Sequence, residues 1–327
     1  RRAASILTAL LVLLAWAGCD VVDPKSSSVG RSIDQECLIP ETEIHEGCAG
    51  KDCIRSLENP ELVAPDRVAY LRDSNRVIGL TIGDTTLAVA HGVLRWHEVA
   101  NFDFTERRIA VTYCPLTGSA LVFDRSAVNG RTFGVSGLLY RNNLIMYDRT
   151  AKEQHESLWT QMRAIGDCGP KTGTRLQIVE AREMKWARWR SLHPNSLVIS
   201  DDDGSSGQYT HNEYRAYEEK HNARVPFPLP EGMDERRPPK ERVLGVPVGP
   251  RAGTAYPFDE LKSAAEQGLA AFTDVVGSRE VAVFWDTDAA SADVFAAERG
   301  EEVLDFTVRD GRIVDRGSGS TWSIEGE

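Results

Sequence analysis

The stretch that decides the fold is residues 76–90, which read Arg76-Val77-Ile78-Gly79-Leu80-Thr81-Ile82-Gly83-Asp84-Thr85-Thr86-Leu87-Ala88-Val89-Ala90. Apolar and β-branched residues are frequent in both halves of this stretch, and Gly83-Asp84 separates the halves with a strong turn signal. The pattern predicts a β-hairpin with strands over 76–82 and 85–90.

Further short strands are expected downstream of the hairpin. We predict them over 108–113, 121–124, 132–136 and 144–148, with turns at Asn129-Gly130 and Asn142-Asn143. Apolar residues at helical spacing predict helices over 93–99 and 258–272, and a short helix over 184–191 is expected to be stopped by Pro194. The sequence therefore predicts an α+β, β-dominated fold of mostly antiparallel short strands with a few helices.

The second half of the chain repeats the pattern of the first. Val77-Ile78-Gly79-Leu80 is echoed by Val243-Leu244-Gly245-Val246, and the strand that ends in Cys114 is echoed by one that ends in Trp285. These echoes predict an internal duplication with two homologous lobes. Because the second copy carries no matching cysteine, we expect a chemical site in the first lobe alone.

The N-terminus has the pattern of an export signal. A basic start at Arg1-Arg2 precedes an apolar run, and Cys19 follows Ala17-Gly18 as in bacterial lipoprotein signals. We expect Cys19 to be lipidated and to anchor the chain in the membrane of the cell envelope, facing the extracytoplasmic side. An ordinary cleaved signal and an uncleaved anchor are the alternatives.

The expected organisation has five parts. These are a lipoprotein-type signal over 1–19, a flexible tether over 20–32, a first lobe over 33–200, a proline-rich connector over 201–241 and a second lobe over 242–327. The 327 residues are 41% hydrophobic, enough for one large core or two modest ones. The net charge of −11 argues against a nucleic-acid partner, which needs clustered Lys and Arg.

Six cysteines in an exported chain indicate disulfides first. Cys48 and Cys53 bracket a short glycine-bearing loop that could close as a small disulfide ring, with a metal pair as the less favoured alternative. Cys37 and Cys168 could form a second bridge. If Cys19 is lipidated, Cys114 is the best candidate for a free thiol.

Cys114 precedes Pro115 at the end of an apolar strand and is the leading candidate for chemistry. A thiol reacts as the thiolate, which needs a nearby base or cation. His97 could be that base, with Glu98 orienting its imidazole, so we take Cys114, His97 and Glu98 as catalytic candidates. The alternative is a buried cysteine that packs as a small hydrophobic residue.

A metal site is a second hypothesis for the same region. His97, Cys114 and His91 could hold copper or another transition-metal ion through nitrogen and sulfur. One cysteine and two histidines fall short of a closed zinc site.

Two weaker ligand sites complete the candidates. Lys51 and Asp52 follow a glycine and could hold an anion, although the spacing of a phosphate loop is incomplete and a structural turn is the favoured alternative. Trp159 and Gln161 could line a ligand groove, although aromatic residues at this spacing are more often in the core.

Several motifs together resemble a known family. They are Trp96-His97-Glu98, Thr112-Tyr113-Cys114-Pro115-Leu116, Phe133-Gly134-Val135-Ser136-Gly137-Leu138-Leu139-Tyr140, Met146-Tyr147-Asp148-Arg149, Ser157-Leu158-Trp159-Thr160-Gln161 and Ala255-Tyr256-Pro257. From about Cys37 to Trp322 the chain resembles the bacterial and archaeal family catalogued as domain of unknown function 3179. The resemblance implies an exported or lipid-anchored protein whose biochemistry is unassigned. This chain departs from the family pattern at His91-Gly92, where Tyr-Pro is usual, and at Cys48 and Cys53.

The leading functional hypothesis is metal or redox-linked small-molecule chemistry at the cell envelope, centred on Cys114 and His97. The rival is a non-catalytic lipoprotein that binds a ligand or an envelope partner and keeps Cys114 in its core. A copper carrier is a third reading. The common hydrolase and dehydrogenase motifs do not occur in the sequence.

Overall fold

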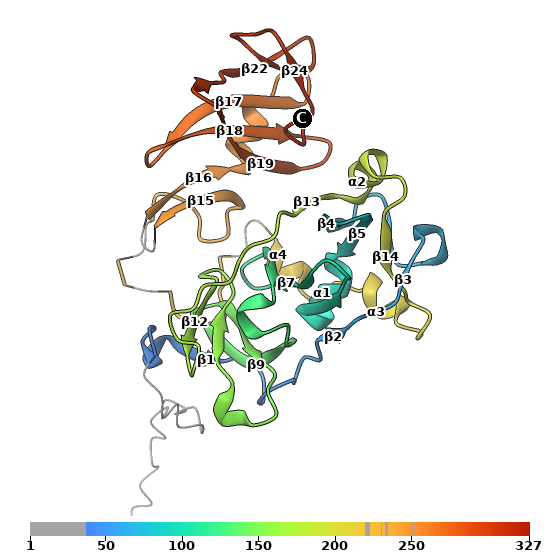
Figure 1. Cartoon of the computed structure of the whole chain (residues 1–327), viewed down its shortest axis with the longest axis vertical. Helices are drawn as coiled ribbons and strands as arrows, with labels where there is room; N and C mark the ends of the chain where they lie inside the picture. Colours follow the sequence, from blue (N-terminus) through green and yellow to red (C-terminus); the bar gives the residue numbers. More distant parts are fainter. Residues whose placement is uncertain (1–36, 220–222, 230, 233–234, 250–251) are drawn as a thin grey trace, which may run out of the picture. The chain divides into compact units, whose positions relative to one another are not determined.

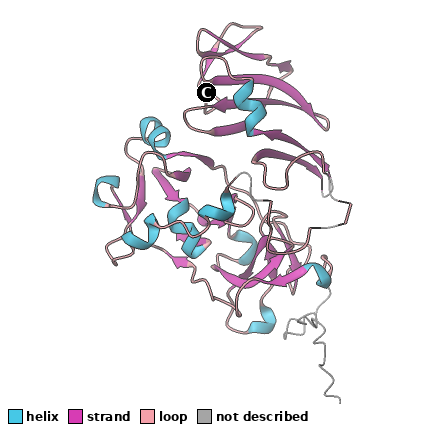
Figure 2. Cartoon of the chain, turned by 180° about the vertical axis from the view of Figure 1, so that it is seen from behind, coloured by secondary structure: helices cyan, strands magenta, loops and turns pink. Residues whose placement is uncertain are grey.

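A computed structural model describes residues 37–219, 223–229, 231–232, 235–249 and 252–327. The expected signal at 1–19 with Cys19 and the expected tether at 20–32 lie outside these residues. Strands dominate the described part, and its helices are short (Figure 2). Most strand pairs are antiparallel, so the expected β-dominated fold is confirmed.

The predicted hairpin forms the centre of a five-stranded sheet. The sheet contains β3 (Leu62–Val63), β4 (Arg76–Ile82), β5 (Thr85–Ala90), β13 (Arg182–Lys185) and β14 (Leu197–Ile199), in the order β13-β4-β5-β14-β3. Both hairpin strands have the predicted bounds. β14 runs parallel to β5, whereas the other pairs are antiparallel.

Two further sheets, in which most strand pairs are antiparallel, complete the expected first lobe (Figure 1). One contains β2 (Leu57–Glu58), β6 (Val99–Asp103), β7 (Arg108–Cys114) and β8 (Ser119–Asp124), with β2 parallel to β6. The other contains β1 (Ile44–Glu46), β9 (Phe133–Tyr140), β10 (Asn143–Asp148), β11 (Leu158–Thr160) and β12 (Ile165–Cys168). The expected strands over 108–113, 121–124, 132–136 and 144–148 all lie within or overlap β7 to β10.

Short helices connect these sheets. They are α1 (His91–His97), α2 (Trp186–Leu192), α3 (Ser206–Thr210) and α4 (Arg215–Glu218), with 3-10 turns η1 (Glu41–Glu43), η2 (Pro65–Arg67), η3 (Ser126–Val128) and η4 (Glu153–His155). The first two lie close to the helices expected over 93–99 and 184–191. α3 and α4 lie within the expected connector. No helix among the described residues is long and apolar enough to cross a membrane.

The second half contains short sheets of its own. They are formed by β15 (Val243–Gly249) with β16 (Ala252–Pro257), by β17 (Leu269–Val276) with β18 (Arg279–Asp286) and β19 (Ser291–Ala296), by β20 (Glu298–Arg299) with β21 (Glu302–Val303), and by β22 (Phe306–Arg309) with β23 (Arg312–Asp315) and β24 (Thr321–Trp322). All of these pairs are antiparallel.

The helix expected over 258–272 is wrong beyond its first turns. α5 covers only Phe258–Ser263, and Leu269 already belongs to β17. Gln267 and Gly268 have φ values of 50° and 89°, a left-handed backbone that an α-helix cannot contain. The apolar residues after this break pair with β18 instead.

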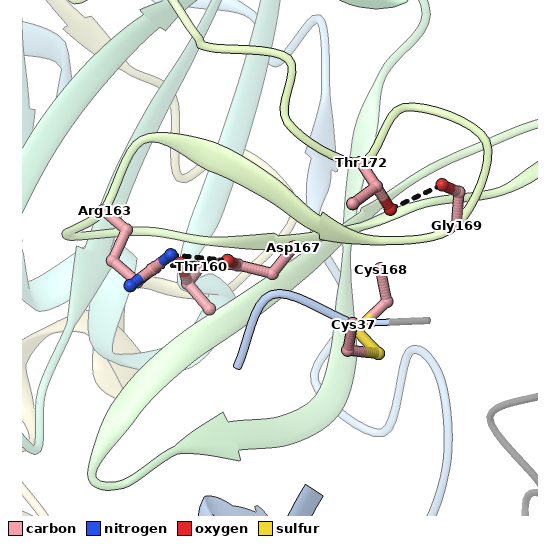
Figure 3. Close-up of a disulfide and its surroundings, with 7 residues drawn as sticks. All are labelled: Cys37, Thr160, Arg163, Asp167, Cys168, Gly169 and Thr172. Carbon is pink, nitrogen blue, oxygen red and sulfur yellow. Dashed lines mark hydrogen bonds and ion pairs between the residues drawn. A yellow bond between two sulfur atoms is a disulfide. The ribbon is translucent and has the colours of Figure 1, made fainter. Parts of the chain in front are cut away.

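Two disulfides join cysteines of the described part. Cys48 and Cys53 close a short ring, with a sequence separation of 5, and Cys37 is bonded to Cys168 over a separation of 131. In Figure 3 the Cys168 side chain on β12 points to Cys37, while the neighbouring Asp167 points to Arg163. Cys114 is the free cysteine of the described residues.

The largest core of the first lobe packs the hairpin against α2. Trp189 is 2% exposed and lies directly over Gly79, so that a Cβ at this glycine would overlap the indole. The echoed position, Gly245 on β15, has no heavy atom within 4 Å of such a Cβ. The two echoed glycines therefore occupy different environments.

We predict that Gly79→Ala lowers the free energy of unfolding by about 1–3 kcal/mol, because the buried Trp189 ring must shift. The control variant Gly245→Ala should stay within about 0.5 kcal/mol of wild type. Urea denaturation of the three proteins measures both effects. Equal stabilities for the two variants would contradict the close packing at Gly79.

We also predict that the two disulfides differ in their effect on stability. The chain-entropy model gives about 5 kcal/mol for the Cys37–Cys168 loop and about 2 kcal/mol for the Cys48–Cys53 ring, because the longer loop restricts the unfolded chain more. Paired substitutions to alanine, followed by urea denaturation without reductant, compare them. A larger loss for the Cys48 and Cys53 pair would contradict this ranking.

Candidate functional site

The site begins where α1 ends. Glu98 caps the helix, and its backbone N–H donates to the Leu94 carbonyl at 2.7 Å. The Glu98 carbonyl accepts a hydrogen bond from Tyr113 N–H at 2.8 Å. This bond continues the β6–β7 ladder by one residue and brings Glu98 beside the end of β7, where Cys114 lies.

Glu98 has an unusual backbone and an unusual side chain. Its φ is 55°, which costs free energy for any residue other than glycine. The residue is only 7% exposed. Burial raises the pKa of Glu98 to about 8, so the side chain is largely a neutral carboxylic acid at pH 7.

Cys114 is fully buried at the end of β7, at 0% exposed. Its Sγ lies 3.6 Å from the Asn142 carbonyl oxygen, a distance suited to a weak S–H donor. Burial, and then the charge of Glu98, raise the pKa of this thiol. In this conformation Cys114 is therefore a protonated thiol that packs among apolar side chains.

Polar side chains surround the turn after Cys114. Asn143 Nδ2 donates to the side-chain oxygens of Thr117 at 3.0 Å and of Gln161 at 2.8 Å. Ser119, the β8 partner of Cys114, donates to Gln161 at 2.8 Å. Gln161 is 0% exposed, so this predicted ligand-binding residue instead holds the turn in place.

A cover segment, defined as residues 205–219 and 223–229, packs on this region. The Tyr217 hydroxyl donates to the Leu116 carbonyl at 2.8 Å, two residues beyond Cys114. Phe227 exchanges backbone hydrogen bonds with the Asn142 side chain at 3.1 and 3.2 Å. Burial, and then Glu98, raise the pKa of Tyr214, which places this phenol in the same electrostatic environment.

His97 takes different partners from those expected. Its Nδ1 lies 2.7 Å from the Arg55 carbonyl oxygen, and its Nε2 lies 3.1 Å from the Tyr209 hydroxyl. Both ring nitrogens are thus occupied by groups other than Cys114. The charge that acts on the thiol comes from Glu98.

His91 belongs to a buried ionic cluster. The Glu183 carboxylate accepts hydrogen bonds from Arg76 at 2.7 Å and Arg242 at 3.0 Å, and His91 Nε2 lies 3.6 Å from it. Burial lowers the pKa of His91 to about 3, so its imidazole is neutral. The His91 ring packs on Tyr113, with ring centroids 4.2 Å apart.

The expected metal site of His91, His97 and Cys114 is not formed. Within the described ranges, no group of three or more His, Cys, Asp or Glu side chains could hold a metal ion. The physical reason is that His97 turns to Arg55 and Tyr209 while His91 faces Glu183, so the imidazoles serve separate contacts.

The other predicted ligand residues have structural partners. Lys51 pairs with Glu156 and with Glu153, and Asp52 pairs with Arg149 at 2.7 Å. Trp159 is 0% exposed and donates its indole N–H to Asp148 at 3.0 Å. These contacts match the structural alternatives considered for the three residues.

The sequence did not identify the tyrosines of the cover segment. Tyr214 and Tyr217 lie in the expected connector, more than 90 residues from Cys114 along the chain. The concentration of aromatic and charged residues from Tyr209 to Arg224 could have indicated a segment that packs on the fold. The prolines that follow it suggested an extended linker instead.

We predict that Glu98 makes the folded protein less stable as the pH rises. The folded state keeps this proton up to a pKa of about 8, whereas the unfolded chain releases it near the ordinary value of 4.5. The stabilising contribution is therefore complete below about pH 4.5 and is lost as the pH approaches 8, with a slope of at most about 1.4 kcal/mol per pH unit.

Urea denaturation of wild type and Glu98→Gln across this pH range tests the effect. The variant's neutral amide should remove the contribution of Glu98 to the slope of the unfolding free energy against pH. Asp293, whose pKa burial raises to about 6, contributes equally to both proteins and cancels in their difference. Identical pH profiles would contradict a buried, protonated Glu98.

Comparison with known proteins gives one match. The family model described as protein of unknown function (DUF3179) matches residues 51–327. No curated protein and no solved structure matches the chain. Since the match covers most of the chain, including α1, β7 and the cover segment, the protein belongs to the DUF3179 family.

Proposed function

We propose that Glu98 and Cys114 form one small-molecule site in the first lobe, in which Cys114 attacks an electrophilic ligand and Glu98 takes the thiol proton. We further propose that the site works at the cell envelope, with the chain held in the membrane by a lipid on Cys19. Metal ions have no part in this proposal, because the imidazoles have other partners.

The observation that carries the proposal is the state of Glu98. A carboxyl group at 7% exposure is costly to ionise, and its positive φ adds a backbone cost. Gly268 directly precedes β17 as Glu98 precedes β6, with φ 89°, and its carbonyl accepts a hydrogen bond from Thr287 N–H at 2.9 Å. A glycine meets this backbone requirement without strain, so the glutamate at the first position is best explained by its side chain.

The comparison of Glu98 with Gly268 depends on the proposed duplication. The order of elements supports it. In the first half a hairpin (β4–β5) is followed by helix α1 and by three neighbouring strands, β6, β7 and β8. In the second half a hairpin (β15–β16) is followed by helix α5 and by three neighbouring strands, β17, β18 and β19. A second set of three neighbouring strands follows in each half, β9, β10 and β11 in one and β22, β23 and β24 in the other.

The proposed reaction class is nucleophilic attack by a thiol. The reaction uses the minority of molecules in which Glu98 is ionised. There the S–H bond of Cys114 breaks, its proton passes to the Glu98 carboxylate, and sulfur bonds to an electrophilic carbon of the ligand. The electron pair of the broken ligand bond leaves with its leaving group. A carboxyl group with a raised pKa is a stronger base than an exposed one, which brings its proton affinity closer to that of the thiol.

The complete burial of Cys114 favours a second candidate. In a ligand-binding or scaffold lipoprotein, this thiol would be a core residue and the cover segment a fixed part of the fold. The two candidates differ in whether small reagents reach Cys114 in the folded protein.

Alkylation by iodoacetamide, with mass spectrometry of the labelled peptide, tests the proposal. Cys114 should react faster than the protein unfolds, with Cys114→Ser as the blank. Tyr217→Phe should accelerate labelling, because it removes the bond between the cover segment and Leu116. Glu98→Gln should slow labelling about tenfold. This factor is smaller than the usual effect of a general base, because Glu98 is not aligned on iodoacetamide as a base is on its own substrate. The exposed Glu61→Gln is the matched control and should change nothing.

The alternative result is equally clear. If Cys114 reacts only at the rate of global unfolding, and Glu98→Gln leaves that rate unchanged after correction for stability, the thiol is a core residue. The proposed reaction then fails, and the scaffold candidate stands.

A further inference from the structure

A hollow of about 400 Å³ lies away from Cys114, at the end of β23 and β24. It is lined by Arg188, Leu192, Leu269, Gly311, Arg312, Ile313, Thr321, Trp322, Ser323 and Ile324. Its volume falls within the range of about 300–1,000 Å³ that is typical of small-molecule sites. None of these residues belongs to the site around Glu98.

The turn between β22 and β23 builds one wall of the hollow. Asp310 and Gly311 have φ values of 50° and 69°, the backbone of a tight hairpin turn. Their Asp-Gly sequence is the preferred one for such a turn. The turn is followed directly by Arg312 and Ile313, which both line the hollow.

The hollow carries positive charge that is only partly neutralised. Arg188 on α2 pairs with Asp286 at 2.9 Å. Arg312 is exposed and forms no ion pair with any described residue. The acidic Glu325 next to the lining is already held by Arg182 at 3.2 Å and His193 at 2.9 Å. One guanidinium therefore has its donors available for an anion.

The remaining lining is mostly apolar. Leu192, Leu269, Ile313, Trp322 and Ile324 supply it, while Thr321 and Ser323 add the only side-chain hydroxyls. A fully polar ligand would make no use of the apolar lining. A cationic ligand would be repelled by the guanidinium of Arg312. The lining fits a molecule with an anionic head and an apolar body.

We propose that this hollow binds a small carboxylate with an apolar tail, whose carboxylate is held by Arg312 and whose tail lies against Leu192, Leu269 and Trp322. Guanidinium and carboxylate match in geometry, since two parallel N–H groups can donate to two oxygens. The site is independent of the reaction proposed for Cys114.

Titration calorimetry of the purified chain with decanoate, below the concentration at which decanoate forms micelles, tests the assignment. Decanoate should bind saturably at one site, and decyltrimethylammonium, with the same tail and the opposite charge, should not. Arg312→Gln should weaken decanoate binding about tenfold or more, as expected for loss of a charge-assisted hydrogen bond. Arg312→Lys should restore part of the affinity.

Arg309→Gln is the matched control. Arg309 is also exposed and pairs with Arg312 across β22 and β23, but it does not line the hollow. Its substitution should change the affinity less than about twofold, as expected for a surface charge that touches no ligand. Three results would overturn the proposal: no saturable decanoate binding, equal binding of the cationic probe, or equal weakening by both arginine variants.

Discussion

One backbone hydrogen bond, from Tyr113 N–H to the Glu98 carbonyl, organises the candidate site. It extends the β6–β7 ladder beyond Val99 and forces the chain to turn sharply between α1 and β6. The turn requires a positive φ, and the residue that adopts it is held inside the sheet rather than at the surface. The buried carboxyl group, the neighbouring thiol and the cover segment all depend on this geometry.

Adjacent residues at the end of α1 therefore have opposite roles. His97 completes the helix and turns its ring to Arg55 and Tyr209, where it ties the cover segment to the N-terminal part of the chain. Glu98 leaves the helix and faces the sheet. A sequence motif places the two side by side, but the helix end separates the directions of their side chains. The adjacency of His97 and Glu98 in the sequence therefore did not show which of the two side chains acts on Cys114.

The sequence predicted those features of the fold that depend on neighbouring residues in the chain. Gly83-Asp84 fixed the hairpin, and β-branched runs marked the strands that follow it. The helix over 258–272 failed because apolar spacing alone cannot reveal the positive φ of Gln267. The metal site failed for another reason: the partners of His91 and His97 come from distant segments, at Glu183 and Tyr209. The burial of Glu98 was equally hidden, since only tertiary packing decides which carboxyl groups are removed from solvent.

The bond between Cys37 and Cys168 also has a mechanical consequence. β1 is a short edge strand whose hydrogen bonds to β9 would separate one after another if the chain before it were pulled. Because Cys37 is bonded to β12, tension that enters at Cys37 passes through a covalent link into another strand of the same sheet. β1 is thus relieved of load, and the strand at the opposite edge of the sheet carries it instead.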